Sequence, residues 1–260
     1  MAVGFKIFPS QRPAALLSLI VANLIIFIIV RIVAMVSAPE LPIEFLSLPS
    51  LATKALTHPW TLVTYMFTQY DVLHILFNML ALYWFGSLLS LRFTQRRVLT
   101  LYFIGGLAGA AFYLGGAALF ARLSGELLGS SAAVMAIMVT AAVMMPDYEI
   151  GLLLIGNVKL KWVAVATLVI FAIGLTGNNA GGHVAHLGGM LAGLIYGLAY
   201  RNRERRQIEA NIRRKEVRTD MQNLDALLDK VKRSGYSSLT SREKEMLTAI
   251  SGRIDSKRNN

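Results

Sequence analysis

One serine, two histidines and one asparagine could together carry out chemistry, although apolar segments surround them. Ser131 opens an apolar run that contains no charged residue before Asp147. His186 lies in a later apolar segment, and His74 and Asn78 lie in an earlier one. A serine becomes a good nucleophile when a neighbouring base removes its proton, and histidine is the usual base. These residue types predict acyl transfer, with Ser131 as nucleophile and His186 as general base.

The other polar groups fit the stabilisation of an oxyanion. No Asp or Glu lies in the apolar segments at the depth of His186, which predicts a Ser–His dyad and not a triad. The candidate donors are the backbone N–H of Ser131, at a helix N-terminus, and the side chains of His74 and Asn78. Because His74 and Asn78 are four residues apart, they share one face of a helix.

Two neighbouring side chains leave alternatives open. Ser130 is a rival nucleophile, but the Gly-x-Ser spacing from Gly129 favours Ser131, and Ser130 fits the cap of the helix. His183 lies three residues before His186, so a zinc site of three histidines is conceivable. The chain has no His-Glu-x-x-His motif, so we expect no metal and no cofactor.

The composition predicts a membrane protein with a soluble tail. Of 260 residues, 55% are hydrophobic and 16% are charged, unlike a soluble globular chain. Residues 201–260 contain 16 Lys/Arg and 9 Asp/Glu (net +7), and residues 1–200 contain 10 and 6 (net +4). We expect a basic cytoplasmic leader at 1–12, a membrane domain at 13–200 and a basic cytoplasmic tail at 201–260. The absence of cysteine excludes disulfides and a thiolate nucleophile.

Six apolar segments predict an all-α membrane bundle, because a spanning helix needs about 20 apolar residues. A cleaved signal peptide is the alternative for the first segment, which is longer than such peptides usually are. Residues 38–70 are broken by prolines and are expected in the membrane interface. A small hairpin of residues 149–154 and 158–162 around Gly156-Asn157 is as plausible as a plain loop. The expected spans are 13–36, 73–91, 98–121, 131–146, 161–175 and 183–200, the fourth and fifth being short.

The distribution of Lys and Arg predicts the orientation of these spans. With both termini in the cytoplasm, the inner segments contain most of the basic residues, and the outer ones contain only Arg31, Lys54 and Arg122. The second, fourth and sixth spans then run inward, so all four polar residues lie at one depth near the outer surface. The inner segments contain Lys6 and Arg12, then Arg92, Arg96 and Arg97, then Lys159 and Lys161, and then the tail.

Small residues predict close packing of the fourth and sixth spans, which would bring His186 to Ser131. We assign Gly105 and Gly109 of the third span to the general packing of a bundle. The small residues are Gly189, Gly193 and Gly197 on the sixth span, and Ala132, Ala133 and Ala136 on the fourth.

The tail predicts a small helical appendage, with a solvated, partly disordered extension as the alternative. The basic stretch 201–206 would attract anionic lipid headgroups. Apolar residues recur at helical spacing from 207 to 233, Gly235 interrupts the pattern, and Thr240 and Glu243 form a capping box for a last helix. No motif supports nucleic-acid binding, and we expect none.

Three motifs, in this order, resemble the rhomboid family of intramembrane serine proteases: His74-Ile-Leu-Phe-Asn78, Gly129-Ser-Ser131 and Ala185-His-Leu-Gly-Gly189. Residues 59–67 also resemble the segment that precedes the second rhomboid helix, and the resemblance covers about residues 13–200. It implies a bacterial-type, six-helix rhomboid bundle in the inner membrane that cleaves single-span membrane proteins near the outer face. By motif match, Ser131 would be the nucleophile and His186 the base, with His74 and Asn78 at the oxyanion.

The chain departs from the family pattern at two positions. The family motif usually has glycine after the serine, where this chain has Ala132, and often has an aromatic residue four positions after it, where this chain has Met135. A catalytically silent, client-binding relative is the main alternative function, but the serine and histidine are both present. A six-span transporter would place its polar residues at the midplane of the membrane.

Overall fold

The computed structural model describes residues 14–37, 40–120, 123, 125–152, 156–177 and 179–258. The expected leader at 1–12 and Arg122 therefore lie outside the described residues. The chain is mostly helical, as predicted, and forms two compact units with a boundary between Arg201 and Asn202.

Each of the six apolar segments forms a helix in the first unit. They are α1 (Ala14–Val36), α5 (Val72–Leu89), α6 (Gln95–Leu119), α7 (Ser131–Met144), α8 (Leu160–Gly174) and the first part of α9 (Ala180–Ser234). Of the described helices, α1, α5 and α6 are long and apolar enough to cross a membrane, and α7 and α8 are shorter apolar helices. The sequence places the end of the sixth segment at residue 200, but α9 continues as one helix of 55 residues.

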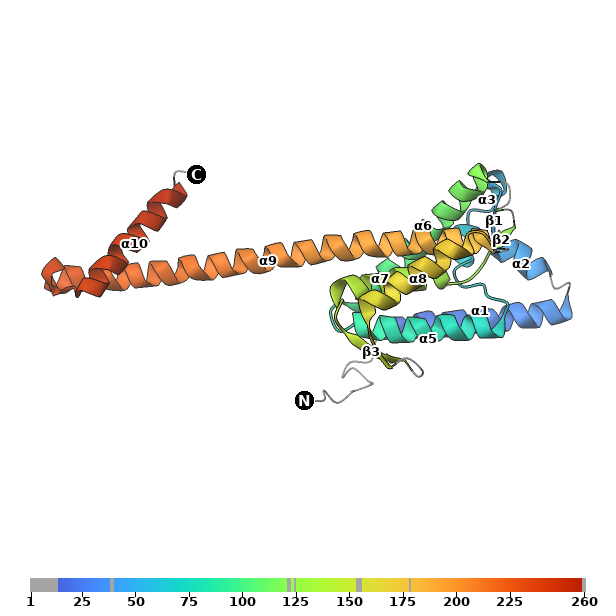
Figure 1. Cartoon of the computed structure of the whole chain (residues 1–260), viewed down its shortest axis with the longest axis horizontal. Coiled ribbons are helices and arrows are strands. Elements are labelled where there is room, and N and C mark those ends of the chain that lie inside the picture. Colours follow the sequence, from blue (N-terminus) through green and yellow to red (C-terminus); the bar gives the residue numbers. More distant parts are fainter. Residues whose placement is uncertain are drawn as a thin grey trace. The chain divides into compact units, whose positions relative to one another are not determined.

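Helix α7 is the centre of this unit, since 11 of its 14 residues are buried. It packs against α5, α6 and α8, and α1 lies beside α5 on the outside of the bundle (Figure 1). At 1.5 Å per residue α7 is about 21 Å long, shorter than the roughly 30 Å hydrocarbon core of a bilayer.

The outer surface of α1 is apolar, as expected for a lipid-facing helix. Its side chains toward the bundle, such as Leu16 and Leu19, are at most 5% exposed. Those on the opposite face are 42–55% exposed, and they are Val21, Leu24, Ile25, Ile28, Ile29 and Ile32. From this surface and from the apolar helices α5 and α6, we conclude that the chain is a multi-pass membrane protein.

In the proline-rich segment between α1 and α5, the described residues form only short elements. They are α2 (Glu40–Leu46), β1 (Leu48–Pro49), α3 (Ala52–Thr57) and α4 (Thr61–Thr64). The Trp60 indole donates to the carbonyl of Phe45 at 2.8 Å, and Thr64 donates to that of Leu46 at 2.7 Å. Strand β1 pairs antiparallel with β2 (Glu126–Leu127), which leads toward Ser131. These contacts fix the strand that precedes the candidate nucleophile.

Of the two alternatives, a hairpin or a plain loop, the hairpin forms, but its turn is not at Gly156-Asn157. Strands β3 (Glu149–Leu152) and β4 (Gly156–Lys159) pair antiparallel, and Gly156 and Asn157 pair with Leu152 and Gly151. Gly156-Asn157 therefore lies in the second strand and not in the turn. Gly156 has φ +85°, which glycine tolerates even inside a strand.

The second unit contains the end of α9, a 3₁₀ turn η2 (Tyr236–Ser238) and α10 (Ser241–Arg258). Helix α9 ends at Gly235, which has φ +79° and donates to the carbonyl of Val231 at 2.8 Å. The predicted capping box is confirmed: the Thr240 N–H donates to Glu243 at 2.8 Å, and the Glu243 N–H donates to Thr240 Oγ1 at 3.3 Å. The buried core of this unit includes Leu227, Leu239 and Ile250.

An ion pair joins the two helices of this unit. Lys230 Nζ lies 2.8 Å from both carboxylate oxygens of Glu243. The hydrogen bonds from Lys230 and from Thr240 lower the pKa of Glu243 to about 2.

Candidate active site

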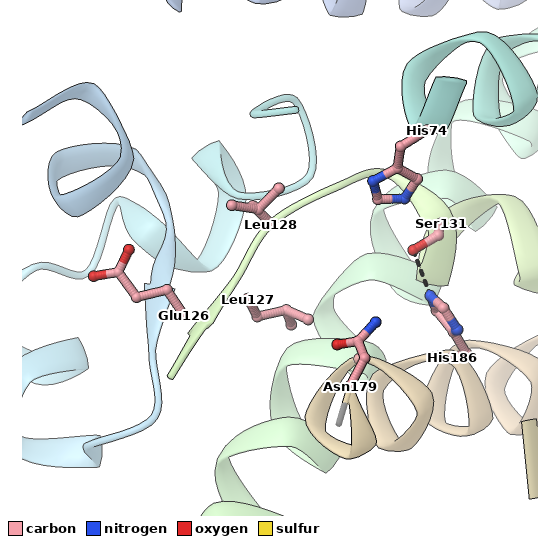
Figure 2. A pocket seen from close by; sticks show the side chains of 8 residues that line it. His74, Glu126, Leu127, Leu128, Ser131, Asn179 and His186 are labelled. Carbon is pink, nitrogen blue, oxygen red and sulfur yellow. Dashed lines mark hydrogen bonds between the residues drawn. The ribbon is translucent and has the colours of Figure 1, made fainter. Parts of the chain in front are cut away.

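Ser131 and His186 are in hydrogen-bond contact, although 55 residues separate them. Ser131 Oγ lies 2.6 Å from His186 Nε2 (Figure 2). Ser131 is the first residue of α7, and His186 lies in the second turn of α9. Ser130, the rival nucleophile, is fully buried, and its hydroxyl accepts from the Gln69 amide at 3.4 Å. The geometry therefore pairs the histidine with Ser131.

Gly129 sets the turn that leads into α7. Its φ of +113° is one that only glycine adopts readily, and its N–H donates to the carbonyl of Tyr65 at 2.9 Å. A Cβ on Gly129 would lie 2.9 Å from the ring of His74. The glycine of the Gly-x-Ser motif thus permits both the turn and the close approach of the His74 ring to that turn.

Small residues on α9 bring His186 to Ser131. A Cβ on Gly189 would overlap the backbone of Ala132, and one on Gly193 would overlap that of Ala136. The hydroxyl of Thr140 donates to the carbonyl of Gly193 at 2.9 Å, which ties the same two helices together. The close approach predicted for these helices is confirmed.

Two glycines of α6 allow that helix to pack closely against another side of α7. A Cβ on Gly105 would overlap the methyl of Ala136, and one on Gly109 would lie 2.5 Å from the methyl of Ala132. The sequence pattern assigns both glycines to general packing, but the structure places them directly against the helix that carries Ser131. The extra methyl of Ala132, relative to the usual family motif, therefore lies in space that Gly109 leaves open.

An aromatic ring packs on His186 even though residue 135 is methionine. The ring of Phe171 in α8 lies 4.3 Å from that of His186, at an interplanar angle of 44°. His183 packs against the same phenylalanine at 5.5 Å and meets His186 edge-on at 5.8 Å. His186 Nδ1 makes no hydrogen bond to any described residue. The orientation of this imidazole therefore depends on Ser131 and on ring packing.

His74 and Asn78 occupy different surroundings although both lie on α5. His74 lines the cavity with Ser131 and His186, and its backbone N–H donates to Asp71, the cap of α5, at 2.7 Å. Asn78 is 6% exposed, and its amide donates to Gln69 at 2.8 Å. It does not line the cavity, but one of its two amide protons remains for another acceptor.

Gln69, which the sequence analysis did not single out, joins Asn78 to α1 and α7. Its amide nitrogen donates to Asn23 at 3.0 Å as well as to Ser130. Asn23 in turn donates to the carbonyl of Leu19 and to the Tyr102 hydroxyl. Because Asn23 uses its nitrogen as donor, its oxygen must accept, and the orientations of Gln69 and Asn78 follow. The signal available in the sequence was a glutamine just before an apolar helix.

The cavity at Ser131 has a volume of about 190 Å³. It also includes residues that spacing alone did not single out, since they come from β2, the loop after it and the residues around the start of α9. Leu127 and Leu128 form an apolar wall, and Asn179 adds a carboxamide; Glu126 lines the rim and accepts from the Ser47 hydroxyl at 2.7 Å. Among the described residues, no group of three His, Cys, Asp or Glu could hold a metal ion.

Comparison with known proteins connects this geometry to a family. The model described as Rhomboid domain matches residues 56–203, more than half of the chain. A family of unknown function, DUF6576, matches residues 207–253.

Curated relatives carry the same family name. The zebrafish (Danio rerio) Presenilin-associated rhomboid-like protein A, mitochondrial, is 27% identical over 159 residues, which are 58% of this chain and 39% of that protein. Arabidopsis thaliana Rhomboid-like protein 16, chloroplastic, is 30% identical over 116 residues, which are 45% of this chain and 35% of that protein. RHOMBOID-like protein 12, mitochondrial, from the same plant is 43% identical over 54 residues, which are 21% of this chain and 16% of that protein. The chain thus spans less than half of each relative's length. On the match over residues 56–203, this chain belongs to the Rhomboid domain family.

Proposed function

We propose that this chain is an intramembrane serine endopeptidase that cleaves transmembrane segments of single-span proteins near the outer membrane face. The observation that carries the proposal is the 2.6 Å distance between Ser131 Oγ and His186 Nε2, at a cavity that also contains His74. Membership of a family that includes serine proteases supports the same conclusion.

The proposed reaction proceeds in two steps. His186 Nε2 takes the Ser131 proton as Oγ attacks the scissile carbonyl carbon, and the oxyanion accepts hydrogen bonds from the Ser131 N–H and from His74 and Asn78. The C–N bond then breaks, and His186 returns its proton to the leaving amine. A water molecule, deprotonated by His186, attacks the ester, and the proton goes back to Ser131 as the acid leaves. All proton transfers use one imidazole and no cofactor.

Labelling with a fluorescent fluorophosphonate tests this function without knowledge of the substrate. We expect labelling of the parent and of Ser130→Ala, and none of Ser131→Ala or His186→Ala. Asn78→Ala should label about ten- to a thousandfold more slowly if one oxyanion donor is lost. Folded parent protein that does not label would refute the protease and favour a silent, client-binding relative.

We also propose six spans in the inner membrane, with both termini in the cytoplasm and anionic lipids at the basic stretch 201–206. The placement of Lys and Arg supports this topology. The chain contains no cysteine. In the variants Lys54→Cys and Arg203→Cys, the introduced cysteine is therefore the only thiol of the protein that a maleimide can label. A membrane-impermeant maleimide should label the first from outside in intact cells, and the second only after lysis. The reverse pattern would overturn the orientation.

A further inference from the structure

Asn179 brings a carboxamide into the cavity at a point that the proposed chemistry does not use. It lies just before α9, seven residues before His186, and lines the same cavity as Ser131. Figure 2 shows Asn179 and His74 on opposite sides of the cavity, with Ser131 between them. If His74 faces the oxyanion, then Asn179 faces another part of whatever chain is bound.

The Asn179 side chain is free to bind a ligand. It is exposed in the cavity, and it makes no hydrogen bond to any residue in the part of the chain that the structure describes. A carboxamide both donates and accepts, as a peptide group does. Leu127 and Leu128, which line the same cavity, have apolar side chains that offer it no hydrogen bond.

Gly182 makes room for this orientation of Asn179. A Cβ on Gly182 would lie 2.7 Å from Asn179 Oδ1, 2.8 Å from Nδ2 and 3.0 Å from Cγ. All three atoms belong to the end of a flexible side chain, which would rotate away at little cost. A methyl group at residue 182 would therefore displace the carboxamide without disturbing the helix.

We infer that Asn179 binds the backbone of the substrate segment beside the scissile bond. The absence of a side chain at Gly182 leaves the space that this orientation of the carboxamide needs. The inference rests on the proposed peptidase function, since a peptide is the ligand. Asn179 makes the same contact before and during the reaction, so it contributes to binding of the chain and not to the attack by Ser131.

Two covalent probes separate binding of a peptide backbone from chemistry at the serine. A small alkyl fluorophosphonate reacts with Ser131 and has no peptide groups. A tetra-alanyl chloromethyl ketone presents a peptide backbone before His186 displaces its chloride. In Asn179→Ala, we expect inactivation by the peptidyl probe to slow about tenfold, the value of one or two neutral hydrogen bonds. The fluorophosphonate rate should stay within about twofold.

Gly182→Ala should reproduce this selective loss, and the double variant Asn179→Ala/Gly182→Ala should lose no more than either single variant. The matched control is Gly177→Ala, in the same loop, where a Cβ would only touch the carbonyl of Gly174 at 3.4 Å. We expect that control to react with both probes at the parent rates.

Three results would overturn the inference. One is an unchanged peptidyl rate in Asn179→Ala; another is an equal loss with both probes, which would assign Asn179 to folding or chemistry. Additive losses in the double variant would show that the added methyl blocks the cavity by itself, against the role given to Gly182. Parent protein that reacts with neither probe would instead refute the peptidase function.

Discussion

The contact between α6 and the first turn of α7 predicts that Gly109→Ala will damage the site without touching it. A Cβ at residue 109 would lie 2.5 Å from the Ala132 Cβ, 3.1 Å from the carbonyl oxygen of Ala185 and 3.2 Å from the Tyr65 hydroxyl. Two methyl carbons normally lie about 3.5–4.0 Å apart. The first turn of α7 must therefore move by about 1 Å.

Both stability and reactivity should fall. Overpacking of this kind costs about 1–3 kcal/mol of unfolding free energy. A shift of about 1 Å in a reacting group costs on the order of a hundredfold in rate, and Ser131 immediately precedes Ala132. We expect Gly109→Ala to label with the fluorophosphonate about a hundredfold more slowly and to unfold at a lower temperature.

The structure offers both a rescue and a control. Ala132→Gly removes the opposing methyl, so the double variant Gly109→Ala/Ala132→Gly should recover most of the lost rate. Gly115→Ala on the same helix meets nothing within 4 Å. It should label normally and gain up to about 1 kcal/mol of helix stability.

The test is to measure the labelling rate and the melting temperature of each variant in detergent-solubilised form. Parent-like labelling of Gly109→Ala would refute the reasoning, because it would show that α7 accommodates the methyl without moving Ser131. A double variant as slow as Gly109→Ala would show that the clash with Ala185 or Tyr65, and not with Ala132, is responsible.

Three further predictions follow from the contacts around the site and in the tail. Gln69→Leu leaves the partners of three buried hydrogen bonds, Asn23, Ser130 and Asn78, without Gln69, at about 1–3 kcal/mol each; it should lower the melting temperature and slow labelling, and an unchanged rate would exclude Gln69 from positioning Asn78. Phe171→Ala should slow labelling up to about tenfold through loss of ring packing on His186, and Phe171→Tyr should restore it; equal rates in both variants would contradict this. Because the pKa of Glu243 is lowered in the folded state, its stabilisation is complete above its ordinary value of 4.5 and is lost as the pH falls toward about 2. Amide exchange of α10 should therefore differ between the parent and Glu243→Gln at pH 6, and this difference should vanish near pH 2; a difference that persists there would contradict the assignment.

The sequence by itself determined the helical membrane domain and the pair of reactive residues. Runs of apolar residues specify helices wherever water is absent, because the backbone must then satisfy its own hydrogen bonds. Ser131 and His186 were recognisable because a polar side chain inside an apolar run costs free energy, and such residues usually have a function. The capping box of Thr240 and Glu243 was equally readable, because its partners are three residues apart.

Only the tertiary structure decided which groups surround that pair. Phe171 reaches His186 from another helix, Gly109 leaves space for Ala132, and Gln69 accepts a hydrogen bond from Asn78. The turn of the β3–β4 hairpin was also misplaced, because pairing across the strands and not the Gly-Asn dipeptide set its register. Periodicity shows which face of a helix is buried but not which neighbour it meets. Contacts between segments far apart in sequence depend on close packing, to which each added methyl group matters.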